Sequence, residues 1–218
     1  STPSNSSAAS DVYKRQVLCV AKPCYRNPNS PKPNFCPMVK YPEIIERALK
    51  KYEDEFIRRI HTVASKVEKQ GYCTWPRLKE ISEFAKKLGI RKLGVAFCIG
   101  LSNEAKFVVE YLERQGFEVY SICCKCGSID KTWIGLSDDD KLVPGSHESM
   151  CNPVIQAELL NYVGTELNIV VGLCVGHDSI FMMYSKAPVI YLIAKDRVTG
   201  HNPAVVMYAQ GYFRRRLE

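Results

Sequence analysis

Several patterns that would place this sequence in a common class are missing. No apolar run reaches the ~20 residues that a membrane-spanning helix needs, and the runs at 169–175 and 189–194 are of strand length. The chain also lacks a Gly-x-Gly-x-x-Gly loop after its first expected strand, a Walker loop, a Gly-x-Ser-x-Gly elbow and a His-Glu-x-x-His motif. These absences argue against a membrane protein, an ordinary dinucleotide enzyme, a P-loop NTPase, a serine hydrolase and a zincin.

Positive charge is present but not concentrated. The net charge is +7, with 30 Lys and Arg residues facing 23 Asp and Glu residues, and Arg214-Arg215-Arg216 is the only tight basic cluster. A nucleic-acid-binding surface normally carries a stripe of Lys and Arg with aromatic residues between them. We therefore expect no nucleic-acid partner, and no membrane partner either.

Cysteine is abundant, with ten residues in the chain. A disulfide framework is disfavoured because Val17–Ala21 is too short for a secretory h-region and runs into Lys22-Pro23. We expect a cytoplasmic, reducing location. The cysteines are then packing residues, metal ligands or redox thiols.

Three segments differ in composition. Residues 1–16 resemble translated sequencing-adaptor read-through or a natural disordered tail, and we exclude them from the fold. Residues 17–40 form a cysteine- and proline-rich head that we expect to bind a metal. Residues 41–218 form an α/β domain with an N-terminal helical extension.

Hydrophobic periodicity predicts the fold of the third segment. Apolar residues at helical spacing predict a long helix over 42–71 and a second over 76–89. Beyond residue 92, nearly continuous apolar strands alternate with helices, which is typical of a parallel sheet covered on both faces. We expect a three-layer, Rossmann- or flavodoxin-like α/β fold preceded by the head and two helices. The predicted strands span 93–100, 117–123, 168–175 and 189–194.

Polar and thiol side chains gather where the predicted strands end. Ligands of parallel sheets bind beyond the carboxyl ends of the strands, where the strand order reverses. We therefore expect a thiol-rich cleft at this edge. Its candidate residues are Cys98, Cys123, Cys124, Cys126, Cys151, Cys174, His177, Asp178, Asp196, Arg197, His201 and Asn202.

These candidates also admit simpler roles. Cys98 and Cys174 have apolar neighbours and, taken alone, are better explained as packing residues. Cys123 and Cys124 point to opposite faces if both lie in a strand, so one of them leaves the core. Cys151 precedes a helix start, where the helix dipole lowers a thiol pKa. Arg197 is either an anion clamp or the partner of a salt bridge.

The head contains a second candidate site. Cys19, Cys24 and Cys36 lie on a proline-stiffened segment, and such thiols suit Zn²⁺ or an iron–sulfur cluster. The usual fourth ligand is either Cys73 or a cysteine lost where the N-terminus was overwritten near Gln16.

At these residues the sequence resembles an uncharacterised bacterial and archaeal family, domain of unknown function 1847, whose members are commonly labelled predicted metal-binding proteins. The motifs that carry the resemblance are Gly172–Asp178, Lys195–Val198, Gly200–Pro203, Met150–Pro153 and Cys123–Lys125. The family's head resembles Cys-x-x-Cys-x₄-Cys followed by Cys-Pro. Cys19, Cys24 and Cys36 match its last three cysteines, and its first falls at Gln16. The resemblance implies metal binding and no particular reaction.

Two main functions remain open. The first is a cytoplasmic metal-binding protein, holding zinc or an iron–sulfur cluster, with a redox role for its thiols. The second is a small-molecule enzyme or sensor whose cleft binds an anionic ligand, with a structural metal. A third reading is an interaction module with packing cysteines. The sequence does not decide whether the chain is an enzyme.

Overall fold

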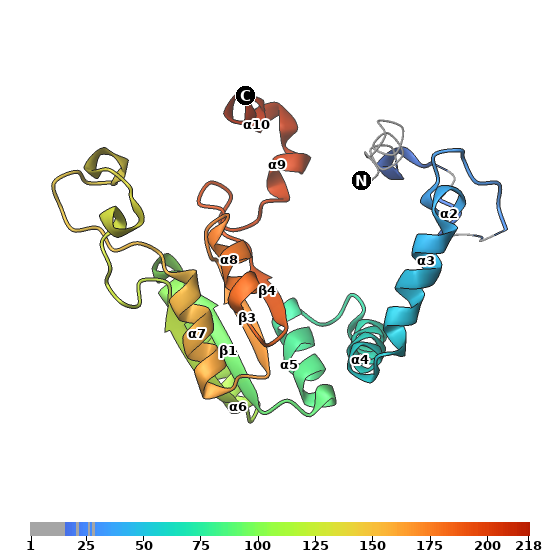
Figure 1. Ribbon diagram of the computed structural model, residues 1–218, viewed down its shortest axis with the longest axis horizontal. Helices are drawn as coiled ribbons and strands as arrows, with labels where there is room; N and C mark the ends of the chain where they lie inside the picture. Colours follow the sequence, from blue (N-terminus) through green and yellow to red (C-terminus); the bar gives the residue numbers. More distant parts are fainter. Residues whose placement is uncertain (1–15, 21, 26, 28) are drawn as a thin grey trace, which may run out of the picture. The chain divides into compact units, whose positions relative to one another are not determined.

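The computed structural model describes residues 16–20, 22–25, 27 and 29–218 of the chain (Figure 1). The chain divides into two compact units, residues 1–62 and 63–218. The tail expected over residues 1–16 lies outside the described residues except for Gln16. Among the described residues, no helix combines the length and apolarity needed to cross a membrane.

The first unit contains short helices. They are η1 (Gln16–Leu18), α2 (Pro37–Lys40), α3 (Pro42–Leu49), η2 (Lys50–Glu53) and the start of α4 (Glu55–Gly71). The single helix predicted over 42–71 is therefore wrong, because the helix breaks at Asp54. The backbone of Asp54 is extended, with ψ of 124°, and its carboxylate accepts a hydrogen bond from the Ile57 amide at 3.0 Å. Asp54 acts as an N-cap for α4, a signal that the hydrophobic periodicity does not contain.

The second predicted helix is confirmed as α5 (Arg77–Leu88). It ends at Gly89, which has a φ of 72° that glycine adopts without strain. The helix lies beside α6 (Ser102–Arg114), since the Ser82 and Tyr111 hydroxyls are 3.2 Å apart and Lys86 donates to Gln115 at 2.6 Å.

The sheet has four parallel strands, as expected. They are β1 (Lys92–Phe97), β2 (Glu118–Cys123), β3 (Leu167–Val171) and β4 (Val189–Ile193), in the spatial order β2-β1-β3-β4. The chain moves outward from β1 to β2, returns to β3 and continues outward to β4. The strand order therefore reverses between β1 and β3, which is the position where doubly wound folds bind ligands.

Helices cover both faces of the sheet. Helices α7 (Pro153–Val163) and α8 (His177–Tyr184) pack on each other and lie over the near face in Figure 1. Helix α6 connects β1 to β2 on the opposite face, as right-handed crossovers in opposite directions require. The three-layer fold is confirmed. The remaining elements are η3 (Ile99–Leu101), η4 (Lys131–Ile134), η5 (Asp138–Asp140), α9 (Val205–Tyr208) and α10 (Gln210–Leu217).

A buried side-chain amide holds the carboxyl ends of β1 and β2 together. Gln156 is fully buried in α7, and its amide nitrogen donates to the carbonyls of Phe97 at 3.2 Å and Ile122 at 2.7 Å. These carbonyls belong to the last residue of β1 and the next-to-last residue of β2. The polar side chain thus ties the two strands together just before their cysteines begin.

Candidate functional site

The carboxyl edge of the sheet collects thiols from three strands. Cys98 follows β1, Cys123 ends β2 and is followed by Cys124, and Cys174 lies just beyond β3. Cys151 enters the same edge from the loop that precedes α7. The amide of Asn152 donates to the Cys124 carbonyl at 2.7 Å, which places Cys151 beside the end of β2.

Three side chains at this edge form a group with metal-site geometry. One ligand atom each from Cys151, Cys174 and His177 lies within 4.8 Å of the other two. Within the residues that the structure describes, this is the only such group of three or more His, Cys, Asp or Glu side chains. The sequence named all three residues individually but did not predict that they form one set.

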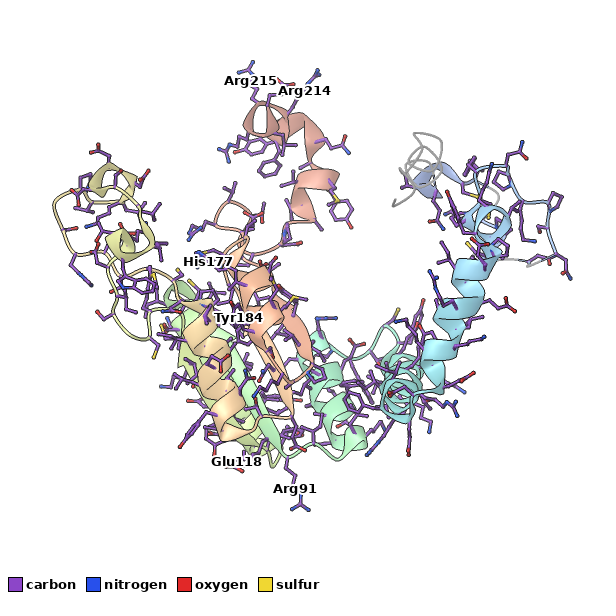
Figure 2. All side chains as sticks on the ribbon, viewed as in Figure 1. Arg91, Glu118, His177, Tyr184, Arg214 and Arg215 are labelled. Atoms are coloured by element: carbon purple, nitrogen blue, oxygen red, sulfur yellow. The ribbon has the colours of Figure 1, made fainter. Side chains whose placement is uncertain are left out.

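Local backbone structure explains why the three meet. Asn152 is the N-cap of α7, since its side chain accepts from the Ile155 amide at 3.0 Å, and Cys151 immediately precedes it. The amide of His177, the first residue of α8, donates to the Cys174 carbonyl at 3.0 Å, so the two ligands share one turn. His177 is labelled in Figure 2.

One ring nitrogen of the His177 imidazole is unpaired. Its Nδ1 is buried and has no hydrogen-bond partner. Buried polar nitrogens are nearly always paired, so an unpaired one beside two thiols needs an explanation. Two thiols and an imidazole are the ligand types that Zn²⁺ prefers, and a metal ion would satisfy the ring.

Arg197 approaches the same group. Its guanidinium Nη2 lies 3.5 Å from the Cys174 sulfur and its side chain is otherwise exposed. Of the two roles expected for Arg197, the ion pair with Asp196 is not among the salt bridges of the described residues. The guanidinium instead contacts the Cys174 thiol of the Cys/His group.

Cys124 lies at the centre of the thiols. It is buried, its sulfur accepts from the Ile99 amide at 3.4 Å, and its side chain hydrogen-bonds to both Cys98 and Cys151. The interactions with Cys151 and Cys98 raise the pKa of Cys124, and the interaction with Cys124 lowers the pKa of Cys151. The low pKa of Cys151 was expected from the helix end, but the bond from Cys124 is its largest cause, with the charges of Lys125 and His177 adding to it.

Sequence reasoning missed a lysine. The Lys195 ammonium donates to the Cys98 sulfur at 2.6 Å, across β3 from the end of β4. The bond from Cys124 and this ammonium hold the pKa of Cys98 well below its usual range, although burial opposes them. Lys195 could have been found, because it directly precedes the Asp196-Arg197 pair that the strand-end pattern already selected.

The other predicted edge residues take different places. Cys123 accepts from the Lys125 amide at 3.5 Å, and Cys126 is half-buried nearby in the chain. The carboxylate of Asp178 accepts from the amides of Gly176 and Ser179. These contacts stabilise the turns that carry the site.

Asp196 and His201 close a turn of their own. The Asp196 amide donates to His201 Nδ1 at 3.1 Å, and its carboxylate accepts from the Val198 and Thr199 amides. Asn202 follows on the surface as an exposed residue. The structure therefore does not bring His201 or Asn202 into the group of Cys151, Cys174 and His177.

The head cysteines line a cavity of their own. Cys19, Cys24 and Cys36 border a space of about 260 Å³, and Gln16 lies on its wall. Cys36 is buried and Cys24 is exposed. Cys73 belongs to the second unit, where it is exposed and has a φ of 55°. The ligand set predicted for the head stays a prediction.

Comparison with known proteins assigns the chain to a family. The family model described as "Protein of unknown function (DUF1847)" matches residues 36–192. The chain belongs to this family. An uncharacterized protein of Methanocaldococcus jannaschii is 42% identical over 200 residues, which cover 92% of this chain and 96% of that protein. No solved structure matches the chain. In this DUF1847 member the matched region includes Cys36, strands β1 to β3, all of β4 but its last residue, and all three residues of the Cys/His group.

Proposed function

We propose that this chain is a metal-binding protein whose centre is formed by Cys151, Cys174 and His177, with Zn²⁺ as the ion that the donors favour. The observation that carries the proposal is the meeting of three ligand atoms within 4.8 Å at the switch point of the sheet. The buried, unpaired Nδ1 of His177 supports it. An iron–sulfur cluster is less well matched, since it is usually held by four thiolates.

Three ligands leave one position of a tetrahedral ion to another donor. Sites with three protein ligands and an open position are typical of zinc that meets water or a substrate. Arg197, 3.5 Å from the Cys174 sulfur, would favour an anion there. Bound zinc would supply a Lewis acid at this position, and the protein's part is to hold the three ligands and the nearby cation.

A titration of the full chain with Zn²⁺ against a chromophoric chelator tests the proposal. We expect one ion per edge site in the parent and a roughly 100-fold weaker affinity in His177→Ala, as expected when one ligand of a structural-strength site is lost. His147→Ala is the matched control, because His147 is an exposed histidine outside the group. Equal affinities for parent and His177→Ala would disprove the centre. Visible absorbance after anaerobic purification would favour a cluster over zinc.

The head is a second candidate metal site. The specific observation in its favour is that Cys19, Cys24 and Cys36 border one cavity together with Gln16, the position where the resembling family has a cysteine. We propose that this cavity binds zinc weakly in the present chain and tightly once a fourth thiol is supplied.

A further inference from the structure

Two cysteines at the edge lie outside the proposed metal ligands, and their backbones are already aligned. Phe97 and Cys123 are register partners at the ends of β1 and β2, so Cys98 and Cys124 occupy the next pair of positions. The Cys124 amide donates to the Phe97 carbonyl at 2.8 Å, which continues the ladder to this pair. Neighbouring strands lie about 4.8 Å apart, inside the Cα separation of about 4.4–6.8 Å that a disulfide requires.

The two thiols also touch. The Cys124 sulfur accepts from the amide of Ile99, the residue after Cys98, at 3.4 Å. The interaction between the two thiols lowers the pKa of Cys98 and raises that of Cys124. Cys98 is 5% exposed and Cys124 is 2% exposed, so little solvent and no bulky reagent reaches them.

A cation stands beside one sulfur of the pair. Lys195 Nζ is 2.6 Å from the Cys98 sulfur and makes Cys98 the better nucleophile of the two. Gly100 provides room for the lysine, because a Cβ at that position would lie 3.3 Å from Nζ. Within the part of the chain that the structure describes, no ammonium hydrogen-bonds to the sulfur of Cys124, so the pair is asymmetric.

We propose that Cys98 and Cys124 are a reactive dithiol that hydrogen peroxide oxidises to a disulfide, with Cys98 attacking, Cys124 resolving and Lys195 assisting. The proposal goes beyond metal binding, since neither cysteine is a ligand of the proposed centre. Peroxide is the oxidant because it is small enough for a nearly closed site. An external dithiol would reduce the disulfide again by exchange.

The two steps balance. In the first, Cys98 reacts as the thiolate, its proton having gone to solvent, while the Lys195 ammonium stays protonated beside the sulfur. The sulfur attacks one peroxide oxygen, an S–O bond forms, the O–O bond breaks, and the departing hydroxide takes up a proton from solvent to become water. In the second, the Cys124 sulfur attacks the sulfenic sulfur of Cys98, the S–S bond forms, and hydroxide leaves with the Cys124 proton as a second water. Two sulfurs are oxidised, one peroxide is reduced to two waters, and the proton that the hydroxide takes from solvent balances the one that Cys98 released.

Peptide mapping of the full chain after brief peroxide treatment tests the reaction. A tryptic digest puts Cys98 between Lys92 and Lys106, and Cys124 before Lys125 on a peptide shared with Cys123. Cys123→Ser therefore serves as the background in which the link is unambiguous. We expect a Cys98–Cys124 linked peptide, restored to free thiols by a dithiol. It should form faster than oxidation of the exposed Cys24.

Variants at the lysine and the choice of oxidant sharpen the test. Lys195→Met should slow disulfide formation about tenfold or more at neutral pH and shift its pH profile upward, whereas Lys195→Arg should restore most of the rate. Oxidised glutathione should react far more slowly than peroxide. Stable sulfinic acid at Cys98 without a link, a Cys124–Cys151 link instead, or an unchanged rate in Lys195→Met would each overturn the proposal. Zinc affinity is measured in a separate titration. Failure of the oxidation test therefore does not count against the zinc centre, and failure of zinc binding does not count against the dithiol.

Discussion

The cysteines of the head and those of the sheet edge are held by different kinds of structure. At the edge, strand ends and helix starts position Cys151, Cys174 and His177 so that their ligand atoms lie within 4.8 Å. In the head, the thiols line a cavity of about 260 Å³ on a chain whose helices are a few residues long. From this difference we expect the edge to need little ordering when it binds a metal, and the head to need more. We therefore expect the free-energy cost of ordering cysteine ligands on metal binding to differ between the two units.

The largest expected effect would make the head resemble the edge. Gln16→Cys adds a fourth thiol to the wall of the head cavity, and we expect a second tightly bound zinc per chain. Structural zinc sites of this type bind with on the order of 10 kcal/mol at neutral pH, so metal analysis and a thermal melt should both detect it. Gln70→Cys, on an exposed position of α4, is the control that adds a thiol elsewhere. An unchanged zinc-to-protein ratio in Gln16→Cys would refute the predicted ligand set.

The second-largest expected effect comes from a substitution that would make the sheet edge less ordered, as we expect the head to be. Gln156→Leu removes the amide that ties the ends of β1 and β2. We expect the free energy of unfolding to fall by about 2 kcal/mol, since two buried carbonyls lose a donor. Zinc affinity should fall as well, because the ligands would have to be ordered on binding. Gln210→Leu, on the exposed surface, should change neither quantity in denaturant titrations and zinc titrations.

A smaller effect separates the ligands from the turn that follows β4. His201→Ala should lower the free energy of unfolding by about 1 kcal/mol, because His201 has a φ of 66° and its ring accepts from the Asp196 amide. Zinc affinity should stay at the parent value, unlike that of His177→Ala. If both His177→Ala and His201→Ala lost zinc binding in the same chelator competition, His201 would be part of the site, as the sequence predicted.

The smallest effect concerns the opposite edge of the same sheet. Glu166 accepts from the amides of Arg91 and Lys92, and these bonds hold its pKa below the ordinary 4.5. A depressed pKa in the folded state stabilises the protein above pH 4.5, and this contribution is lost as the pH falls through the folded-state pKa. We expect Glu166→Gln to cost about 0.5 kcal/mol at pH 7, the low end for exposed hydrogen bonds.

Unfolding measured against pH checks this sign. The difference between parent and Glu166→Gln should shrink toward zero as the pH falls below 4.5 and through the lowered folded-state pKa. A difference that grew in acid would contradict the assigned cause. Hydrogen exchange at Arg91 and Lys92 should quicken in the variant, while exchange at the head should not change.

The fold was predictable because its signals are long and local. Four apolar segments with helices between them leave few alternatives to a parallel three-layer sheet. The break between α3 and α4 was missed because one capping residue, Asp54, overrides a continuous apolar pattern. Such a cap has the strength of about one hydrogen bond, which periodicity does not register.

The sequence predicted where the candidate site lies but not which residues form it. Strand ends identified Cys151, Cys174 and His177, together with several residues that do not meet them, because the edge of a sheet is wider than one site. The ring of His201 instead accepts from the Asp196 amide, in a turn where both Gly200 and His201 are left-handed, and hydrophobic patterns do not predict such a turn. Lys195 was overlooked because a lysine after a strand is usually solvated, and only the fold carries it across β3 to Cys98.

Gly172 is a position at the carboxyl edge of the sheet where the backbone leaves no room for substitution. It starts the turn from β3 toward Cys174 with a φ of 67°, and a Cβ there would lie 2.6 Å from Leu101 Cδ2. Any side chain would meet both a steric clash and an unfavourable backbone conformation. In a saturation mutagenesis screen this position should tolerate no replacement, even though Gly172 binds nothing itself. A lineage could exchange the chemistry of the thiols around it while this residue stayed fixed.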